Sequence, residues 1–159
     1  MKHMNKIEVD LSPIWVTGLP IPPSSNGQYK PFKSKHTGKL SFKATPELEA
    51  YKRNLDLCFY KNPGLFLSNI KKLESWLANG IYLEVKATFF LNVKTMLTQK
   101  GEPKRMDVSN KLKSLHDGLA KLLQVDDSLF FKISAEKRLT HSNEVESVVV
   151  EINPYFIET

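Results

Sequence analysis

The sequence predicts a single α+β domain, a small mixed β-sheet with helices packed on it. Three observations lead to this prediction. The 159 residues match the size of one ordinary domain and can bury a core. Hydrophobic residues make up 41% and charged residues 25%, which is typical of a globular chain. Segments of helical and strand periodicity follow one another without an internal repeat or a linker, so residues 1–159 are treated as one domain.

The first part of the chain predicts a strand, a long loop and a helix. Ile14–Leu19 is a short run rich in strand-forming residues. Prolines and an Asn-Gly pair open the next stretch, Pro20–Lys43, which we expect to begin as a turn or extended loop. Thr45 followed by Pro46 is typical of a helix cap and first turn. Apolar residues at helical spacing carry this helix to about Cys58.

The later part predicts a second helix, a strand, a loop, a third helix and two strands. A break at Lys61–Gly64 precedes a helix over Ser68–Asn79. Ile81–Leu91 alternates apolar and polar residues, as a half-buried strand does. A polar loop is expected over Asn92–Lys104. The remaining elements are a helix from Asp107 to about Leu123 and two strands, Leu129–Leu139 and Val145–Ile152.

The chain is basic, with a formal net charge of +6 and a pI of about 9.3. A basic balance favours anionic partners, most often nucleic acid, although basic proteins without such a partner exist. No apolar run of about 18 residues is present, so no membrane span is predicted. The N-terminal residues lack the apolar region of a secretory signal, and Cys58 is the single cysteine, which excludes an internal disulfide. These features predict a cytoplasmic protein.

Lysines dominate the segment after the prolines. Residues 28–43 hold no acid, and Tyr29, Phe32 and Phe42 are interleaved with the cations. This composition suits a mobile arm that neutralises phosphates and stacks on bases or sugars. The alternative is a solvated hairpin loop whose aromatic rings pack back into the core. The cations expected to contact nucleic acid are Lys30, Lys33, Lys35, Lys39 and Lys43, joined by Lys104 at the end of the later polar loop and by Arg105 directly after it.

The helix expected after Arg105 has an apolar side and a polar side. At about 100° per residue, its apolar residues form one stripe that would face the core. Its acids, an amide and a lysine fall together on the opposite side, which is either a solvated face or part of a site. The stripe consists of Val108, Leu112, Leu115, Leu119 and Leu122, and the polar arc of Asp107, Asn110, Lys113 and Asp117.

Two more acids, Asp126 and Asp127, follow this helix. The helix dipole disfavours anions at a C-terminus, so adjacent acids there are unfavourable unless a strand carries them elsewhere or a cation offsets them. Carboxylates from a helix start and a neighbouring strand suit Mg²⁺, which prefers oxygen ligands. These residues by themselves leave a metal site and a solvated face both open. His116 lies on another side of the helix from Asp117 and is expected to be a surface histidine.

Two motifs resemble the RusA family of Holliday-junction resolvases, which is common in phages and prophages. One is Asp-x-Ser-Asn-x-x-Lys-x-x-x-Asp-x-Leu, from Asp107 to Leu119, followed by Asp126-Asp127-Ser128 and a strand. The other is Pro-Pro-Ser-x-Asn-x-x-Tyr, on Pro22, Pro23, Ser24, Asn26 and Tyr29. The acidic motif is the more specific of the two, and residues 62–80 hold no family motif.

The resemblance implies a small α+β domain, a homodimer, and cleavage of four-way DNA junctions that depends on Mg²⁺, with Mn²⁺ as an alternative. By motif position, Asp107 matches the family's first catalytic aspartate, and Asn110 matches its asparagine, here expected to contact DNA. The catalytic residues implied are Asp107, Lys113, Asp126 and Asp127, and the implied metal ligands are Asp107, Asp127 and Asp117.

One position departs from the family pattern. Ser109 stands where well-studied members carry a second aspartate two residues after the first. A serine hydroxyl is neutral and a weaker ligand, so the enzyme could be slow, need Mn²⁺ or be inactive. Three hypotheses follow: a structure-selective DNA endonuclease, a DNA-junction-binding protein of the same fold with little or no nuclease activity, and a single-strand nucleic-acid-binding module whose acids form a solvated face.

Overall fold

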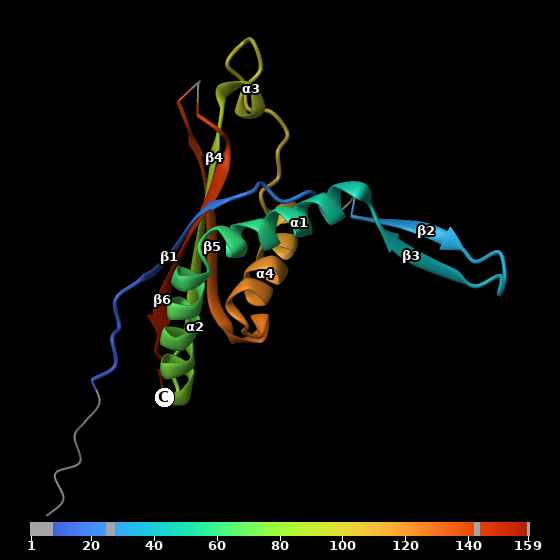
Figure 1. Ribbon diagram of the computed structural model, residues 1–159. Coiled ribbons are helices and arrows are strands. Elements are labelled where there is room, and N and C mark those ends of the chain that lie inside the picture. Colours follow the sequence, from blue (N-terminus) through green and yellow to red (C-terminus); the bar gives the residue numbers. More distant parts are fainter. Residues whose placement is uncertain (1–7, 25–27, 142–143, 159) are drawn as a thin grey trace, which may run out of the picture.

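The structure is a computed structural model that describes residues 8–24, 28–141 and 144–158. It confirms the predicted α+β fold, with a mixed four-stranded sheet of order β1-β6-β4-β5 and a separate two-stranded sheet, β2-β3 (Figure 1). The strands are β1 Ile14–Leu19, β2 Tyr29–Lys33, β3 Leu40–Ala44, β4 Tyr82–Leu91, β5 Phe130–Leu139 and β6 Ser147–Tyr155.

The main sheet buries one of its faces. Strand β6 is antiparallel to both β1 and β4, whereas β5 runs parallel to β4, and β1 and β5 are the two edge strands of this order. A parallel neighbour requires a crossover connection, which here contains the two helices Val93–Met96 and Ser109–Leu123. Alternate residues of β4 show which face is covered, because Leu83, Val85 and Phe89 are fully buried while the residues between them are more accessible.

Four helices and a 3₁₀ turn complete the described elements. They are α1 Pro46–Lys61, α2 Pro63–Ala78, α3 Val93–Met96, α4 Ser109–Leu123 and the 3₁₀ turn Asp127–Leu129. The predicted cap is confirmed, since the Thr45 side chain accepts a hydrogen bond from the backbone N–H of Leu48. Within the described part of the chain, no helix combines the length and apolar character needed to span a membrane.

Several predicted boundaries were wrong. The break expected over Lys61–Gly64 is the single residue Asn62, because Pro63 occupies the first turn of α2 and its fixed φ suits that place. The first helix therefore continues past Cys58, and the second begins before Ser68. The loop after β4 contains the short helix α3, the last helix begins at Ser109 and not at Asp107, and the last strand spans 147–155 and not 145–152.

Helix α4 is held firmly against the core. Leu115, Leu119 and Leu123 are essentially inaccessible to solvent. At Gly118 the helix approaches α1 so closely that a Cβ atom would overlap Cδ1 of the buried Leu55. Any side chain at this position would displace that leucine. The ends of α4, which carry the predicted acids, are thus fixed relative to the sheet.

We expected a basic loop over residues 20–43. The structure instead has an antiparallel hairpin of β2 and β3 in this segment. It extends away from the rest of the protein (Figure 1). Every residue of β2, and Leu40 through Lys43 of β3, is exposed. Tyr29 pairs with Ala44 near the base, and Lys33 pairs with Leu40 near the tip. An isolated hairpin in water is marginally stable, so this arm suits a role in which a partner covers it.

Candidate active site

Asp107 stands just before the first turn of α4 and is held by Ser109. Its Oδ1 accepts hydrogen bonds from the backbone N–H of Ser109 at 2.9 Å and from the Ser109 hydroxyl at 2.5 Å. These two bonds are the main reason that the pKa of Asp107 lies below its ordinary value, and the nearby Lys137 cation contributes in the same direction. Asp107 is therefore an exposed, ionised carboxylate with a fixed orientation.

A cleft of about 870 Å³ opens beside Asp107. Its walls come from segments far apart in the sequence: Ser24 from the proline segment, Lys104 and Arg105 from the loop before α4, and Asn110 from the first turn of α4. The structure thus brings together the predicted residues Asp107, Asn110, Lys104 and Arg105. The cations can bind an anionic ligand such as a phosphate. The carboxylate beside them can then act as a catalytic group on the bound ligand. Asn26, another residue of the proline motif, lies outside the described residues.

Two lysines connect the segments that form this cleft. Neither of them was singled out from the sequence. Lys111, which also lines the cleft, donates a hydrogen bond from Nζ to the carbonyl oxygen of Pro22 at 3.0 Å. Partial burial lowers the pKa of Lys111. Lys137 of β5 donates from Nζ to the carbonyl oxygen of Met106 at 3.1 Å. Their acceptors are backbone carbonyls, which every residue has, so nothing in the sequence pattern indicates these contacts.

Asp126 and Asp127 lie past the other end of α4. Oδ1 of Asp126 accepts from the backbone N–H of Ser128 at 2.8 Å, a bond that lowers the pKa of Asp126. Asp127 begins the 3₁₀ turn, and both carboxylates are exposed. The 15 residues of α4 span about 22 Å at the usual helical rise. The paired acids and Asp107 are thus separated by the length of the helix.

The other predicted residues of the polar arc point elsewhere. Asp117 lines a groove between α1 and α4 together with Tyr51 and Gln28. Lys113 is exposed, and among the described residues no ion pair joins it to Asp117. Across the described part of the chain, no three His, Cys, Asp or Glu side chains gather into a group that could hold a metal ion.

His116 is buried and not, as we expected, at the surface. It is 9% exposed, and its ring meets Phe130 edge-on at a centroid distance of 5.7 Å. Its Nε2 is buried and finds no hydrogen-bond partner among the residues that the structure describes. Burial lowers the pKa of His116, and the carboxylates of Asp117 and Asp127 offset only part of this effect. The prediction failed because it considered the helix alone, whereas the start of β5 covers this side of α4.

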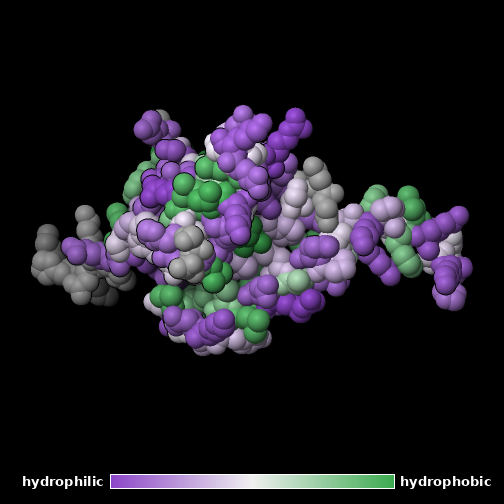
Figure 2. Space-filling view, turned by 90° about the horizontal axis from the view of Figure 1, so that it is seen from above, coloured by the Kyte–Doolittle hydropathy of each residue, from purple (hydrophilic) through white to green (hydrophobic). Residues whose placement is uncertain are grey.

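The hairpin displays two different faces. Strand alternation places Lys30, Phe32 and Lys43 on one side, where Nζ of Lys43 lies 3.6 Å from the centre of the Phe32 ring. The apolar residues Tyr29, Pro31, Leu40 and Phe42 share the other side. Figure 2 shows the arm standing clear of the body, with hydrophobic surface flanked by hydrophilic surface. The alternative in which the aromatic rings pack into the core is wrong, because Tyr29 is 55% and Phe42 68% exposed.

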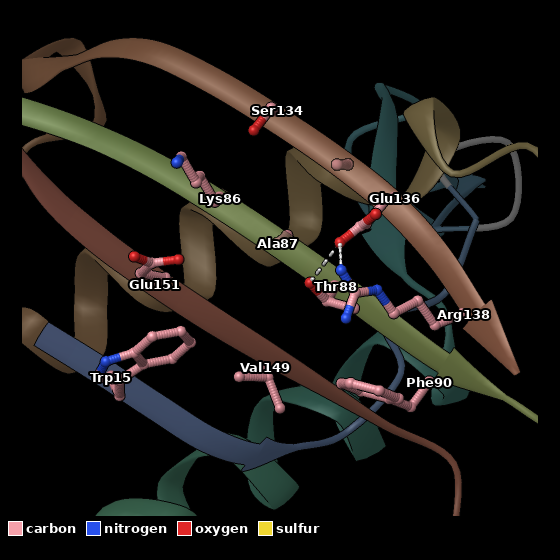
Figure 3. A pocket seen from close by; sticks show the side chains of 11 residues that line it. Trp15, Lys86, Ala87, Thr88, Phe90, Ser134, Glu136, Arg138, Val149 and Glu151 are labelled. Carbon is pink, nitrogen blue, oxygen red and sulfur yellow. Dashed lines mark hydrogen bonds and ion pairs between the residues drawn. The ribbon is translucent and has the colours of Figure 1, made fainter. Parts of the chain in front are cut away.

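A second hollow lies on the sheet face opposite to the core (Figure 3). Glu136 of β5 occupies its border, where it forms an ion pair with Arg138 at 2.9 Å and accepts a hydrogen bond from Thr88 at 3.5 Å. Trp15 lies at the opposite border, on β1. The hollow contains no predicted site residue. The cleft beside Asp107 is therefore the better candidate for the active site.

Residues 20–153 match the family model described as endodeoxyribonuclease RusA. The chain belongs to the RusA family. The matched range begins at the proline segment and ends within β6, so it includes every predicted site residue. RusA membership implies Holliday-junction resolvase activity, action on DNA junctions, and a general dependence on divalent metal ions. No curated protein matches the chain.

The metal dependence of the RusA family can be compared with the residues present. Asp107, Asp126 and Asp127 supply the oxygen donors that Mg²⁺ prefers. One chain does not bring the two ends of α4 together, however, and its described residues form no complete metal site. The ligand assignment to Asp107, Asp127 and Asp117 thus stays a prediction.

Proposed function

We propose that this protein is a structure-selective endonuclease that cuts four-way DNA junctions by paired nicking, in recombination or repair in the cytoplasm. Family membership supports the general activity. The observation that carries the proposal for this chain is the carboxylate of Asp107, ionised and fixed by Ser109 at the edge of a basic cleft. Asp10 accepts the same two hydrogen bonds from Ser12 outside this cleft, so the feature that favours a site over a solvated acidic face is the presence of Lys104 and Arg105, cations that suit phosphate, beside Asp107.

The predicted site residues that line the cleft, together with Lys113, each have a role in this proposal. Lys104 and Arg105 bind the phosphates that flank the scissile bond, and the guanidinium of Arg105 suits two phosphate oxygens at once. Asn110 donates a hydrogen bond to the DNA backbone, and Asp107 supplies a fixed negative oxygen at the reacting phosphate. Lys113 is exposed one turn further along α4. Its cation stabilises the negative charge that develops on the phosphate during the reaction. A divalent ion, Mg²⁺ or Mn²⁺, supplies activation of water and neutralisation of charge when bound.

The hairpin is proposed to hold the arms of the junction. Its lysines, Lys30, Lys33, Lys35, Lys39 and Lys43, contribute positive charge without a single acid between residues 28 and 43. Charge of one sign on an exposed arm attracts DNA phosphates and makes binding sensitive to salt. The exposed rings of Tyr29 and Phe42 can stack on bases that lack neighbours at a branch point.

A second candidate is a protein that binds junctions without cutting them. Two observations favour it: Ser109 replaces a carboxylate, and no three acids gather within the described part of one chain. The two candidates bind the same DNA and differ only in cleavage.

The test is cleavage of an end-labelled four-way junction and of a linear duplex of the same sequence, each with Mg²⁺, Mn²⁺ or EDTA. The nuclease predicts paired, symmetric nicks in the junction, an intact duplex and no cleavage in EDTA. Tight junction binding without nicks in either metal would support the binding protein instead. Equal affinity for single strands and junctions would support a single-strand-binding module.

A further inference from the structure

The groove between α1 and α4 contains two buried hydroxyl groups whose hydrogen-bonding capacity the described residues leave unused. Tyr51 of α1 and Ser114 of α4 both line the groove, and each is only 4% exposed. Neither hydroxyl has a hydrogen-bond partner within the part of the chain that the structure describes. A buried polar group without a partner costs free energy, so two of them beside one hollow favour a ligand that supplies the partners.

The close approach of the two helices holds the Tyr51 hydroxyl at the groove. A Cβ atom added at Gly118 would lie 3.7 Å from the hydroxyl oxygen of Tyr51. This hydroxyl therefore lies beside α4 at a point where that helix has no side chain. Burial raises the pKa of Tyr51, so the hydroxyl keeps its proton and can both donate and accept a hydrogen bond. The Ser114 hydroxyl has the same double capacity.

The remaining walls of the groove suit one small planar ring. Its volume is about 260 Å³, just below the range of about 300–1,000 Å³ that is usual for drug-sized ligands. Asp117, exposed on α4, adds a hydrogen-bond acceptor, and Lys52, exposed on α1, adds a cation. Apolar walls with polar groups at one side are the features that recognise an unstacked nucleobase. The apolar walls come from Leu48, Leu55 and Leu122.

The groove adjoins the two parts of the protein that are proposed to bind DNA. Gln28 and Tyr29, at the base of the basic hairpin, line one side of it (Figure 1). On α4, Asn110 lines the cleft of Asp107, and Ser114 follows four residues later in the groove. These two positions share one side of the helix and lie about 6 Å apart along its axis. A strand whose phosphate lies in the cleft can therefore place a neighbouring base in the groove.

Uptake of a base also gives a physical reason for the selection of branched DNA. A base inside a linear duplex is paired and stacked on both sides, and its removal from the stack costs free energy. The cost is smallest for a base that already lacks a partner or a neighbour, as bases at a branch point can. A protein that takes up a base therefore binds a branch point more readily than an intact duplex.

We infer that the groove between α1 and α4 takes up one unstacked nucleobase of the junction, next to the phosphate that the Asp107 cleft binds. The inference rests on the proposed binding of four-way junctions, but not on their cleavage. The hydroxyls of Tyr51 and Ser114 bond to the edge of the base, and the leucine side chains contact its faces. A free mononucleotide carries the same base, so the experiments below separate the two sources.

Removal of the hydroxyls tests the groove. Tyr51→Phe with Ser114→Ala should melt at the wild-type temperature or above it, because neither hydroxyl has a partner among the described residues. The same variant should bind a four-way junction about tenfold more weakly in EDTA. The matched control, Tyr82→Phe with Ser75→Ala, removes two hydroxyls outside the groove, from β4 and α2, and should bind as wild type does.

Two results of this comparison would overturn the inference. If the buried hydroxyls only hold a water molecule, Tyr51→Phe with Ser114→Ala binds the junction as tightly as wild type. If the control variant loses as much affinity as the groove variant, the loss does not come from the groove.

Removal of the base tests the ligand. An abasic nucleotide is placed in turn at each position beside the branch point, and junction binding is measured in EDTA. At one position wild type should lose about tenfold in affinity, the effect of one stacked base. Tyr51→Phe with Ser114→Ala should lose clearly less there, because the base and the hydroxyls contribute to the same contact. No abasic effect at any position, or an equal effect in both proteins, would contradict the inference.

NMR of the backbone amides separates the two sources of the base. The amide signals of Ser114 and Gly118 should shift when the junction is added and shift less with the abasic junction. Shifts with the four nucleoside monophosphates but none with the junction would show a site for free nucleotides and refute the inference. Base-dependent binding without cleavage would sink the nuclease proposal alone, whereas cleavage without any abasic effect would sink the base-binding groove alone.

Discussion

The hydroxyl and the backbone N–H of Ser109 both donate to the same oxygen, Oδ1 of Asp107. Ser109, at the position where the resemblance predicts a second aspartate, thus fixes the carboxylate of Asp107. A hydroxyl that orients a carboxylate strengthens a site through a contact outside the ligand set. Asp126 and Ser128 repeat this arrangement at the other end of α4 through the backbone N–H of Ser128.

Ser109→Ala should weaken cleavage by about 10–100-fold while junction binding changes little, because the orientation of Asp107 is lost but its charge remains. The pKa of Asp107 should rise, since its largest lowering contribution is removed. Carboxyl-carbon NMR titration measures this shift. Ser128→Ala is the control and should leave the Asp107 titration unchanged. An unaltered Asp107 midpoint in Ser109→Ala would contradict the role given to the serine.

Lys113→Ala should abolish or strongly reduce cleavage with a change in the free energy of unfolding of less than about 0.5 kcal/mol, because the side chain is exposed. Leu115→Ala, two residues on, should lower the free energy of unfolding by about 2–5 kcal/mol, because Leu115 is fully buried. Urea denaturation and junction cleavage separate the two effects. A large loss of stability in Lys113→Ala would show that the lysine is structural.

Lys30→Gln with Lys43→Gln should weaken junction binding, because each of these lysines is proposed to neutralise a DNA phosphate. The slope of log affinity against log salt should fall by about one for each lysine–phosphate interaction that the variant removes. Fluorescence anisotropy over a series of salt concentrations measures this slope. The matched control, which removes the same number of charges, is Lys61→Gln with Lys71→Gln, two exposed lysines on α1 and α2 outside the hairpin. An equal change of slope in the control variant would mean that the hairpin has no special role and that net charge alone governs binding.

His116 should make the fold less stable as the pH falls below about 6.5, the ordinary value for histidine. Burial lowers its pKa in the folded state, so the unfolded chain binds the proton first and stability is lost between pH 6.5 and the lower folded value. One such proton changes the free energy of unfolding by at most about 1.4 kcal/mol per pH unit. His116→Gln should flatten this dependence in urea titrations, and His36→Gln, at an exposed position, should not.

Local patterns predicted much of the fold. The alternation in β4 and the cap at Thr45 depend on residues adjacent in sequence, and both are present as expected. The hairpin was predicted only as an alternative to a mobile loop, because its strands have no buried face to produce alternation. The burial of His116 depends on Phe130, and the cleft depends on the contact between Lys111 and Pro22. Contacts of this kind join distant segments and leave no periodic signal.

The sequence predicted a set of candidate site residues, but not how these residues are arranged in space. The motif positions identified the acids at both ends of α4, and the structure places Asp107 and Asn110 on one cleft with Lys104 and Arg105. Helical periodicity placed Asp117 on the same arc, yet it faces a groove beside α1. Periodicity gives the direction in which a side chain projects from the helix axis. It does not give how far apart two side chains lie along that axis, or which residues of other elements each one contacts.

The measurement that tests the central claim most directly is cleavage of a labelled four-way junction by wild type, Asp107→Asn and Asp127→Asn, with each protein at a concentration that saturates binding. We predict paired nicks by wild type in Mg²⁺ or Mn²⁺, and no nicks by either variant on a junction that both still bind. Undiminished cleavage by Asp107→Asn would contradict the assignment of the active site to the start of α4.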